Sequence, residues 1–335
     1  MIRDSAEAFL ADASPSAAVR AAMASDAGYD AATWQRLCTE LCWPAIHIPE
    51  EYGGLGLGFV ELAILMEQMG RRLFCSPFFA TACLATPALL LAANEAQKQR
   101  WLPAIAAGEC RASLAWADAA DQGPHACAVQ VRREGTGFVL DGSVSLVVDG
   151  HSADLLIVAA RSPGSQGEAG ISLFAVPATV AGLKRRLLPT LDQTRKLAAL
   201  EFNHCYVEGD ALLGAAEGGA APLQQVLQMA ATALAAEQVG GAQQALDLTL
   251  AYLAERQQFG RPIASFQAIK HRAADMMVQL ECARSAAYYA ACVAEEALYI
   301  GGDRQVAAEL PLAGALAKAQ GSEAFFHCAA ESIQL

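Results

Sequence analysis

The stretch that decides the fold is AERQQFGRPIASFQAIKHRAADM, residues 254–276. It separates two long segments whose apolar residues recur at helical spacing. Gly260 and Pro262 stop the first helix, and Ser265 is placed to cap the second. The helical spacing is carried before the turn by Leu223, Val226, Leu227, Leu234, Val239, Leu246, Leu250 and Leu253, and after it by Ile269, Met276, Met277 and Leu280. The pattern predicts an antiparallel helical hairpin at the core of a bundle.

The turn carries more chemistry than a connector between helices needs. Arg256, Gln258, Phe259 and Gln267 together offer a fork of donors, an aromatic plate and two amides. That combination suits a phosphate-bearing cofactor with an aromatic ring. Arg256 also lies in the last helical turn, where a cation stabilises the exposed carbonyls without any ligand. The residues of the turn leave both interpretations open.

Beyond the hairpin, the chain divides into three segments that differ in the spacing of their apolar residues. Residues 1–112 have helical periodicity. Residues 113–215 contain short runs rich in Val, Leu and Ile, such as GFVLDG, DLLIVAAR and GISLFAV, separated by glycine-bearing turns. Helical periodicity returns over residues 216–335. We therefore predict a multidomain α and β fold with an N-terminal helical domain, a middle antiparallel sheet or small β-barrel, and a C-terminal helical bundle.

Composition and charge exclude several classes of protein. The 335 residues are 54% hydrophobic and only 17% charged, which predicts a large core, and the net charge of −12 argues against nucleic acid or an anionic membrane as a partner. No apolar run approaches the roughly 18 residues of a membrane helix. The chain begins without the basic-then-apolar layout of a signal peptide. Ten cysteines without a C-x-x-C pair predict reduced thiols in a cytoplasmic protein.

Two local motifs invite a functional interpretation that the spacing does not support. The run EEYGGLGLGF, residues 50–59, lacks the third glycine of a dinucleotide fingerprint and follows no predicted strand, so it predicts a structural turn. His271 and Asp275 are four apart on a helix, a spacing more typical of a surface contact than of an acid–base pair. The six histidines never approach metal-ligand spacing, so no metal site is predicted.

The string ERQQFGRPIASFQAIKHRAADM resembles the hairpin turn of the acyl-CoA dehydrogenase family, with its R-x-x-F-G pattern followed by Q-A-I. IPEEYGGLGLG, LAALEFNHCYVEGDALLG and AAESIQL extend the resemblance, in order, over nearly the whole chain. It implies an FAD enzyme that removes hydrogens from the α and β carbons of an acyl-CoA thioester. It also implies a homo-oligomer or a heteromer, with an electron-transfer flavoprotein as the electron acceptor.

The same resemblance assigns roles to residues of the turn. In the family each FAD is shared, because one subunit holds the flavin ring and the hairpin of its mate holds the pyrophosphate and adenosine. Carried over, Arg256 binds the pyrophosphate, Phe259 packs on the cofactor, and Gln267 and Gln334 form hydrogen bonds to it.

Several positions depart from the family pattern, all on the ring and substrate side. The string ADAADQGP, residues 117–124, lacks the family's threonine and its glycine-serine element. Ala117 replaces that threonine, Leu146 the ring-contacting tryptophan, and Val148 a second threonine. The catalytic glutamate of one branch of the family aligns with Ala230, and the other branch places it past Leu335. The catalytic residue therefore stays unassigned.

These departures leave two main hypotheses. In the first, the chain is a catalytic acyl-CoA dehydrogenase subunit of an oligomer. In the second, it is a non-catalytic or half-site partner subunit of a heteromeric acyl-CoA dehydrogenase, of the kind found in bacteria that degrade steroid side chains. A flavin monooxygenase or oxidase on the same fold is a weaker third hypothesis, because fold does not fix chemistry.

Overall fold

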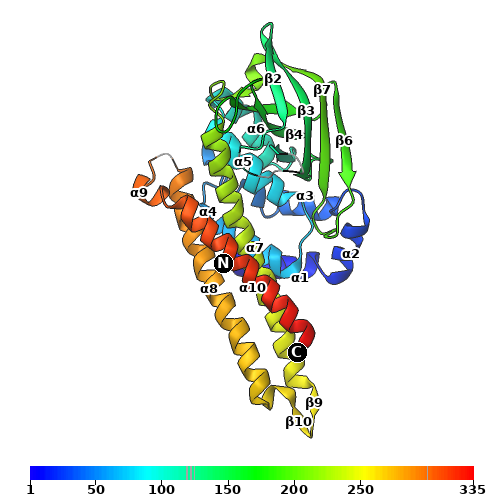
Figure 1. Ribbon diagram of the computed structural model, residues 1–335. Coiled ribbons are helices and arrows are strands. Elements are labelled where there is room, and N and C mark those ends of the chain that lie inside the picture. The colour runs from blue at the N-terminus through cyan, green and yellow to red at the C-terminus, as the bar shows by residue number, and fades with distance from the viewer. Residues whose placement is uncertain (118–119, 121–122, 124, 300) are drawn as a thin grey trace. The chain divides into compact units, whose positions relative to one another are not determined.

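The computed structural model describes residues 1–335 except 118–119, 121–122, 124 and 300 (Figure 1). The chain forms two compact units. The first unit contains Met1–Val19, Gly58–Phe74 and Gln228–Leu335, and the second contains Arg20–Leu57 and Cys75–Leu227. Among the described residues, no helix is both long enough and apolar enough to cross a membrane.

The first unit is a helical bundle. Its helices are α1 (Ile2–Ala13), α4 (Phe59–Arg72), most of α7 (Ala220–Glu255), α8 (Gln267–Leu298), α9 (Arg304–Ala307) and α10 (Leu310–Gln334). Small residues line the contacts between these helices, among them Ala283, Ala287 and Ala290 of α8, all buried. Helices α7 and α4 approach closely, because a β-carbon added at Gly240 would lie 1.8 Å from the carbonyl oxygen of Glu67. The abundant alanine and glycine therefore let helix backbones pack closely.

The predicted helical hairpin is present, with one correction. Between α7 and α8, β9 (Gln257–Gln258) pairs antiparallel with β10 (Arg261–Pro262), and a 3₁₀ turn, η5 (Ile263–Ser265), follows. Phe259 and Gly260, the two residues between β9 and β10, both have positive φ, as tight β-hairpin turns require. The predicted cap is wrong: Phe266 occupies the N-cap of α8, and the buried hydroxyl of Ser265 has no partner among the described atoms.

The second unit begins with helices and turns. It contains most of α2 (Ser16–Ala24), α3 (Ala31–Thr39), η1 (Trp43–Ala45), η2 (Glu50–Tyr52), the π-helical η3 (Phe79–Ala85), α5 (Thr86–Ala92) and α6 (Glu95–Ala106). The glycine run after η2 is a structural turn, as predicted. A β-carbon at Gly54 would lie 1.9 Å from the carbonyl oxygen of Ile48, which also accepts a hydrogen bond from the amide of Gly56 at 2.9 Å.

A mixed sheet forms the rest of the second unit. Its strands are β1 (Ala112–Ala115), β2 (Val129–Glu134), β3 (Gly137–Val148), β4 (Leu155–Arg161), β5 (Ile171–Pro177), β6 (Leu183–Leu188), β7 (Leu197–Val207) and β8 (Leu212–Leu213). The 3₁₀ turn η4 (Gly209–Ala211) connects β7 to β8. The strand order is β6-β7-β3-β2-β4-β5-β8, with β1 against β4. Most strand pairs are antiparallel, as predicted, but two pairs are not. Both β1 and β2 run parallel to β4, which each reaches through a longer connection than a hairpin.

One face of this sheet carries the core of the second unit. Val131, Leu140, Leu156, Phe174 and Leu200 are among its buried side chains. The order of helices, central sheet and helices along the chain confirms the predicted fold class. The predicted domain boundaries at residues 112 and 215 stay a prediction, because the two compact units join segments from both ends of the chain.

Candidate cofactor site

The end of the α7–α8 hairpin presents an unpaired cation and an exposed aromatic ring. Arg256 follows the last residue of α7, its side chain is exposed, and no hydrogen bond or ion pair to that side chain exists within the described parts of the chain. Phe259 is 91% exposed, although a phenylalanine ring is ordinarily buried, and its φ of 51° is a conformation that non-glycine residues rarely adopt. An exposed ring held in a strained turn is a candidate binding surface.

The second arginine of the turn is engaged inside the hairpin. The guanidinium of Arg261 lies 4.1 Å from the ring centre of Phe266, a cation–π contact. Phe266 in turn meets Phe259 edge to face, with ring centres 6.1 Å apart. Arg261 thus stabilises the turn, whereas Arg256 keeps its donors free for a ligand.

The two predicted glutamines lie at this same end of the bundle. Gln267 opens α8 and is exposed, and its amide lies 3.4 Å from the ring of His271. Gln334 ends α10, whose last turns are held to α8 by an Arg272–Glu331 ion pair at 2.5 Å and to α7 by a Thr249–Ser332 hydrogen bond at 2.8 Å. The structure therefore brings together the helix ends that carry Arg256, Gln267 and Gln334. The guanidinium of Arg256, which has no partner in the described structure, suits an anionic group such as a phosphate.

His271 and Asp275 do not form the acid–base pair that their spacing allowed. His271 makes its contact with Gln267, and both His271 and Asp275 are exposed to solvent. No hydrogen bond between the two side chains is present in the described structure. This agrees with the interpretation of the spacing as a surface feature.

The positions that align with the flavin-ring contacts lie together in the second unit. The carbonyl of Ala117 accepts a hydrogen bond from the amide of Ser145 at 3.2 Å, and the carbonyl of Val148 accepts one from the Ser113 hydroxyl at 2.5 Å. The side chains of Ala117, Leu146 and Val148 are hydrocarbon and offer no donor. Part of the predicted 117–124 string lies outside the described residues. At these described positions the ring side lacks side-chain hydrogen-bond donors for a flavin, whereas the hairpin side has the donors of Arg256.

The backbone around these positions is unusual. Leu146 has a φ of 59° at an irregularity in the pairing of β3 with β7, and Asp149 has a φ of 52°. Asp149 is buried, and one of its carboxylate oxygens has no partner among the described atoms. Burial raises the pKa of Asp149 to about 7, against the opposing charge of Arg195. The sequence marks this group only as a carboxylate directly after an apolar strand, and it was not predicted.

The residue that aligns with the family's catalytic glutamate, Ala230, is buried. Ala230 is 4% exposed within α7, and its neighbour Met229 is fully buried. The backbone carbonyl of Gln228 accepts the hydroxyl of Thr232 at 3.1 Å, an ordinary contact within a helix. No acid–base group stands at this position, so the catalytic residue remains unassigned.

Comparisons with known proteins bear on both ends of the chain. The family model described as acyl-CoA dehydrogenase, N-terminal domain, matches residues 1–109. The model described as acyl-CoA dehydrogenase, C-terminal domain, matches residues 217–335. The acyl-CoA dehydrogenase IpdE2 of Mycobacterium tuberculosis is 35% identical over 336 residues, which cover 100% of this chain and 84% of the relative.

Solved structures share the fold over nearly the full chain. A variant of the Tcur3481-Tcur3483 steroid ACAD is 28% identical, with a TM-score of 0.84, covering 99% of this chain and 84% of that one. A glutaryl-coenzyme A dehydrogenase in complex with glutaryl-CoA is 27% identical, with a TM-score of 0.88, covering 100% and 84%.

Proposed function

Because this chain belongs to the acyl-CoA dehydrogenase family, we propose that it takes part in the flavin-dependent α,β-dehydrogenation of an acyl-CoA thioester, as a subunit of an oligomer. Members of the family are oxidoreductases that act on acyl-CoA and use FAD, so the enzyme class and cofactor predicted from the sequence are confirmed. When bound, FAD supplies the acceptor for the hydride that leaves the β-carbon of the thioester.

One observation carries the proposed role of this chain within the oligomer: its two parts of the flavin site are unequal. At the hairpin, Arg256 has free donors and Phe259 presents a bare ring. At the ring side, Ala117, Leu146 and Val148 offer only hydrocarbon. We therefore infer that Arg256, Phe259, Gln267 and Gln334 hold the pyrophosphate and adenosine of an FAD whose ring lies in a partner subunit.

This inference favours a half-site subunit of a heteromeric acyl-CoA dehydrogenase over a homo-oligomer with its own complete sites. The name of the Tcur3481-Tcur3483 steroid ACAD joins two components, so a paired assembly has a precedent among structures similar to this chain. A homomeric enzyme would have to bind the flavin ring without side-chain donors at Ala117 and Val148. Such a site would lack the hydrogen bonds that orient the ring's polar edge.

Exposed apolar side chains on the first unit support association with a partner. They lie on α7, α8 and α10, and association with a partner would remove this exposed apolar surface from water. The set comprises Leu248, Leu250, Tyr252, Met277, Val278, Leu312, Leu316, Phe326 and Ile333.

The remaining predicted features complete the proposal. An electron-transfer flavoprotein accepts the electrons, as the family resemblance implies. The assembly acts in the cytoplasm, where the ten cysteines, all unbridged, stay reduced.

Flavin counting tests the proposed role. The chain is purified alone and again after co-expression with a related acyl-CoA dehydrogenase subunit encoded nearby, and bound FAD is measured by absorbance. We expect little flavin on the chain alone and stoichiometric flavin, bleached by acyl-CoA, on the pair. One tightly bound FAD per chain in the protein purified alone would refute the half-site role and restore the homomeric catalytic interpretation.

A further inference from the structure

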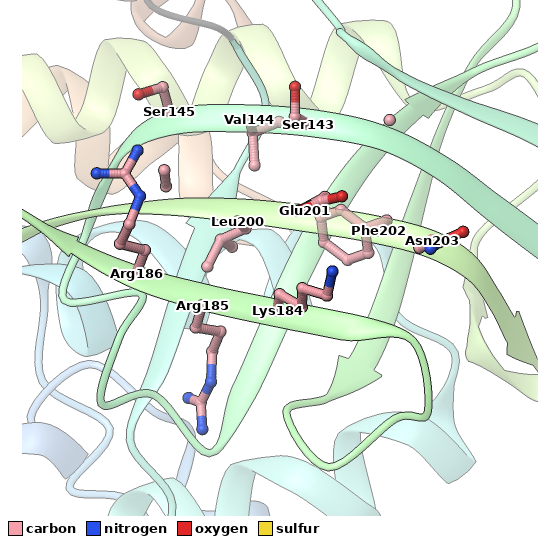
Figure 2. A pocket seen from close by; sticks show the side chains of 12 residues that line it. Ser143, Val144, Ser145, Lys184, Arg185, Arg186, Leu200, Glu201, Phe202 and Asn203 are labelled. Atoms are coloured by element: carbon pink, nitrogen blue, oxygen red, sulfur yellow. The ribbon is translucent and has the colours of Figure 1, made fainter.

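A second candidate site lies on the sheet of the second unit, on the face of β3, β7 and β6. A hollow of about 1020 Å³ there is lined by twelve residues: Gly142, Ser143, Val144, Ser145, Lys184, Arg185, Arg186, Ala199, Leu200, Glu201, Phe202 and Asn203. We call this hollow the β6 groove (Figure 2). Its lining holds three cations against one carboxylate, in a chain whose net charge is −12.

Strand register places the charged side chains of the groove. Lys184 is paired with Glu201 and Arg186 with Ala199 across β6 and β7, while Ser143 is paired with Glu201 from the other side. Residues two apart on a strand share a face, so Lys184 and Arg186 point to the same side. Figure 2 shows both turned towards β7, whereas Arg185 turns the opposite way.

Of the three cations, two are unused. Arg185 donates to the carbonyl of Ala153 at 2.8 Å and is thereby held away from the groove. Lys184 and Arg186 are exposed, and neither forms a hydrogen bond or ion pair with any described residue, although Lys184 stands opposite Glu201. Charges on an edge strand also discourage unwanted pairing. Protection of the edge does not explain the hollow beside the strand. The hollow is large enough to hold a ligand that pairs with the two unused cations.

Strand β6 ends the sheet, with β7 as its only neighbour in the strand order of the described chain. Its other edge is therefore open to a further strand. Lys184 and Arg186 are about 6.6 Å apart along β6, which equals the repeat between alternate side chains of any extended chain. Ser143, Ser145 and Asn203 add hydroxyl and amide groups to the same lining.

We propose that the β6 groove binds an extended acidic segment of a partner protein, with carboxylates at alternate positions that meet Lys184 and Arg186. The charge of the groove selects an anion, and the spacing of the two cations selects an extended chain. The hollow is open, and its lining mixes charged, polar and apolar groups, which suits a peptide laid along the strand better than an enclosed small molecule. Association through such exposed charges is weak and sensitive to salt.

Fluorescence anisotropy with a short labelled peptide of alternating Glu and Val, at about 20 mM salt, tests the proposal on the full chain. We expect the double variant Lys184→Ala with Arg186→Ala to weaken binding about tenfold. The matched control is Arg20→Ala with Lys98→Ala, which removes the same charge from the same unit outside the groove. The control should change the affinity less than about twofold. Circular dichroism checks that both variants fold.

Two further experiments test the charge that the groove selects and the extended conformation of its ligand. Glu201→Gln removes the carboxylate from the groove and should tighten binding about twofold. A peptide of the same composition with its Glu and Val residues in separate blocks should bind about fivefold more weakly than the alternating peptide. Equal affinity for the two peptides would overturn the proposal. Tighter binding of inorganic pyrophosphate than of the alternating peptide would overturn it as well, because the groove would then be a small-anion site.

Discussion

Glu67 of α4 and Arg284 of α8 form an ion pair in the interior of the first unit. Their side chains are only 4% and 18% exposed. Tyr288 donates to the second carboxylate oxygen of Glu67 at 2.8 Å, and Arg284 also donates to the amide oxygen of Gln243 at 2.5 Å. The pair thus joins α4, α7 and α8, beside the close approach of Gly240 to the backbone of Glu67.

Removing one partner of this ion pair should lower the free energy of unfolding more than removing both partners together. Arg284→Met removes the close cation of Glu67 and leaves its buried carboxylate with only the more distant Arg3, at 3.9 Å. The variant should lower the free energy of unfolding by about 3 kcal/mol. The double variant Glu67→Leu with Arg284→Met removes both charges and should cost less than the single one. Urea unfolding at one fixed protein concentration measures both. A double variant less stable than Arg284→Met would contradict this account.

The close crossing of α7 and α4 predicts a steric effect. Gly240→Ala places a methyl group 1.8 Å from the carbonyl oxygen of Glu67 by its ideal geometry, so the helices must separate. We expect a loss of about 1–3 kcal/mol in thermal or urea unfolding. Gly314→Ala is the matched control, because its added carbon would lie 3.2 Å from the carbonyl of Gln228. A larger loss at Gly314 than at Gly240 would show that backbone contact does not limit this crossing.

Asp149 predicts a pH dependence of stability. Its folded-state pKa is raised to about 7, above the ordinary value of 3.8, so between these values the folded state binds the proton more tightly than the unfolded state. Stability contributed by the protonated group is therefore complete below pH 3.8 and is lost as the pH rises towards 7.

Asp149→Asn should remove this loss. The variant should match the parent near pH 4 and exceed it by up to about 4 kcal/mol near pH 8. Thermal unfolding of both proteins across this range measures the difference, in which the other carboxylates cancel. A difference that does not grow with pH would mean that Asp149 is charged in the fold and paired with Arg195.

The hydrophobic period was sufficient to predict the helix–sheet–helix order, because burial on one face dictates spacing in both helices and strands. It was insufficient for the parallel pairing of β1 and β2 with β4, since a buried strand has the same pattern in either direction. Ser265 failed as a cap because the 3₁₀ turn through Ser265 displaces the start of α8 by one residue. The β6 groove could not be predicted, because the segment LKRRLL forms a groove only where β3 and β7 lie beside it in the folded sheet.

Arg256 gives the sharpest prediction about the cofactor. A charge-assisted hydrogen bond from arginine to phosphate contributes about 1.5–3 kcal/mol, so Arg256→Ala should weaken FAD retention by about one to two decades in the co-purified assembly. Arg261→Ala removes the same charge from the same turn but only the cation–π contact with Phe266, and Leu146→Ala alters the ring side of this chain. Both should change FAD retention less than Arg256→Ala. The fluorescence of flavin released during dialysis measures FAD retention in all three variants. Retention in Arg256→Ala equal to that of the parent, with loss in Leu146→Ala, would place the cofactor in this chain's own sheet unit and reverse the assignment.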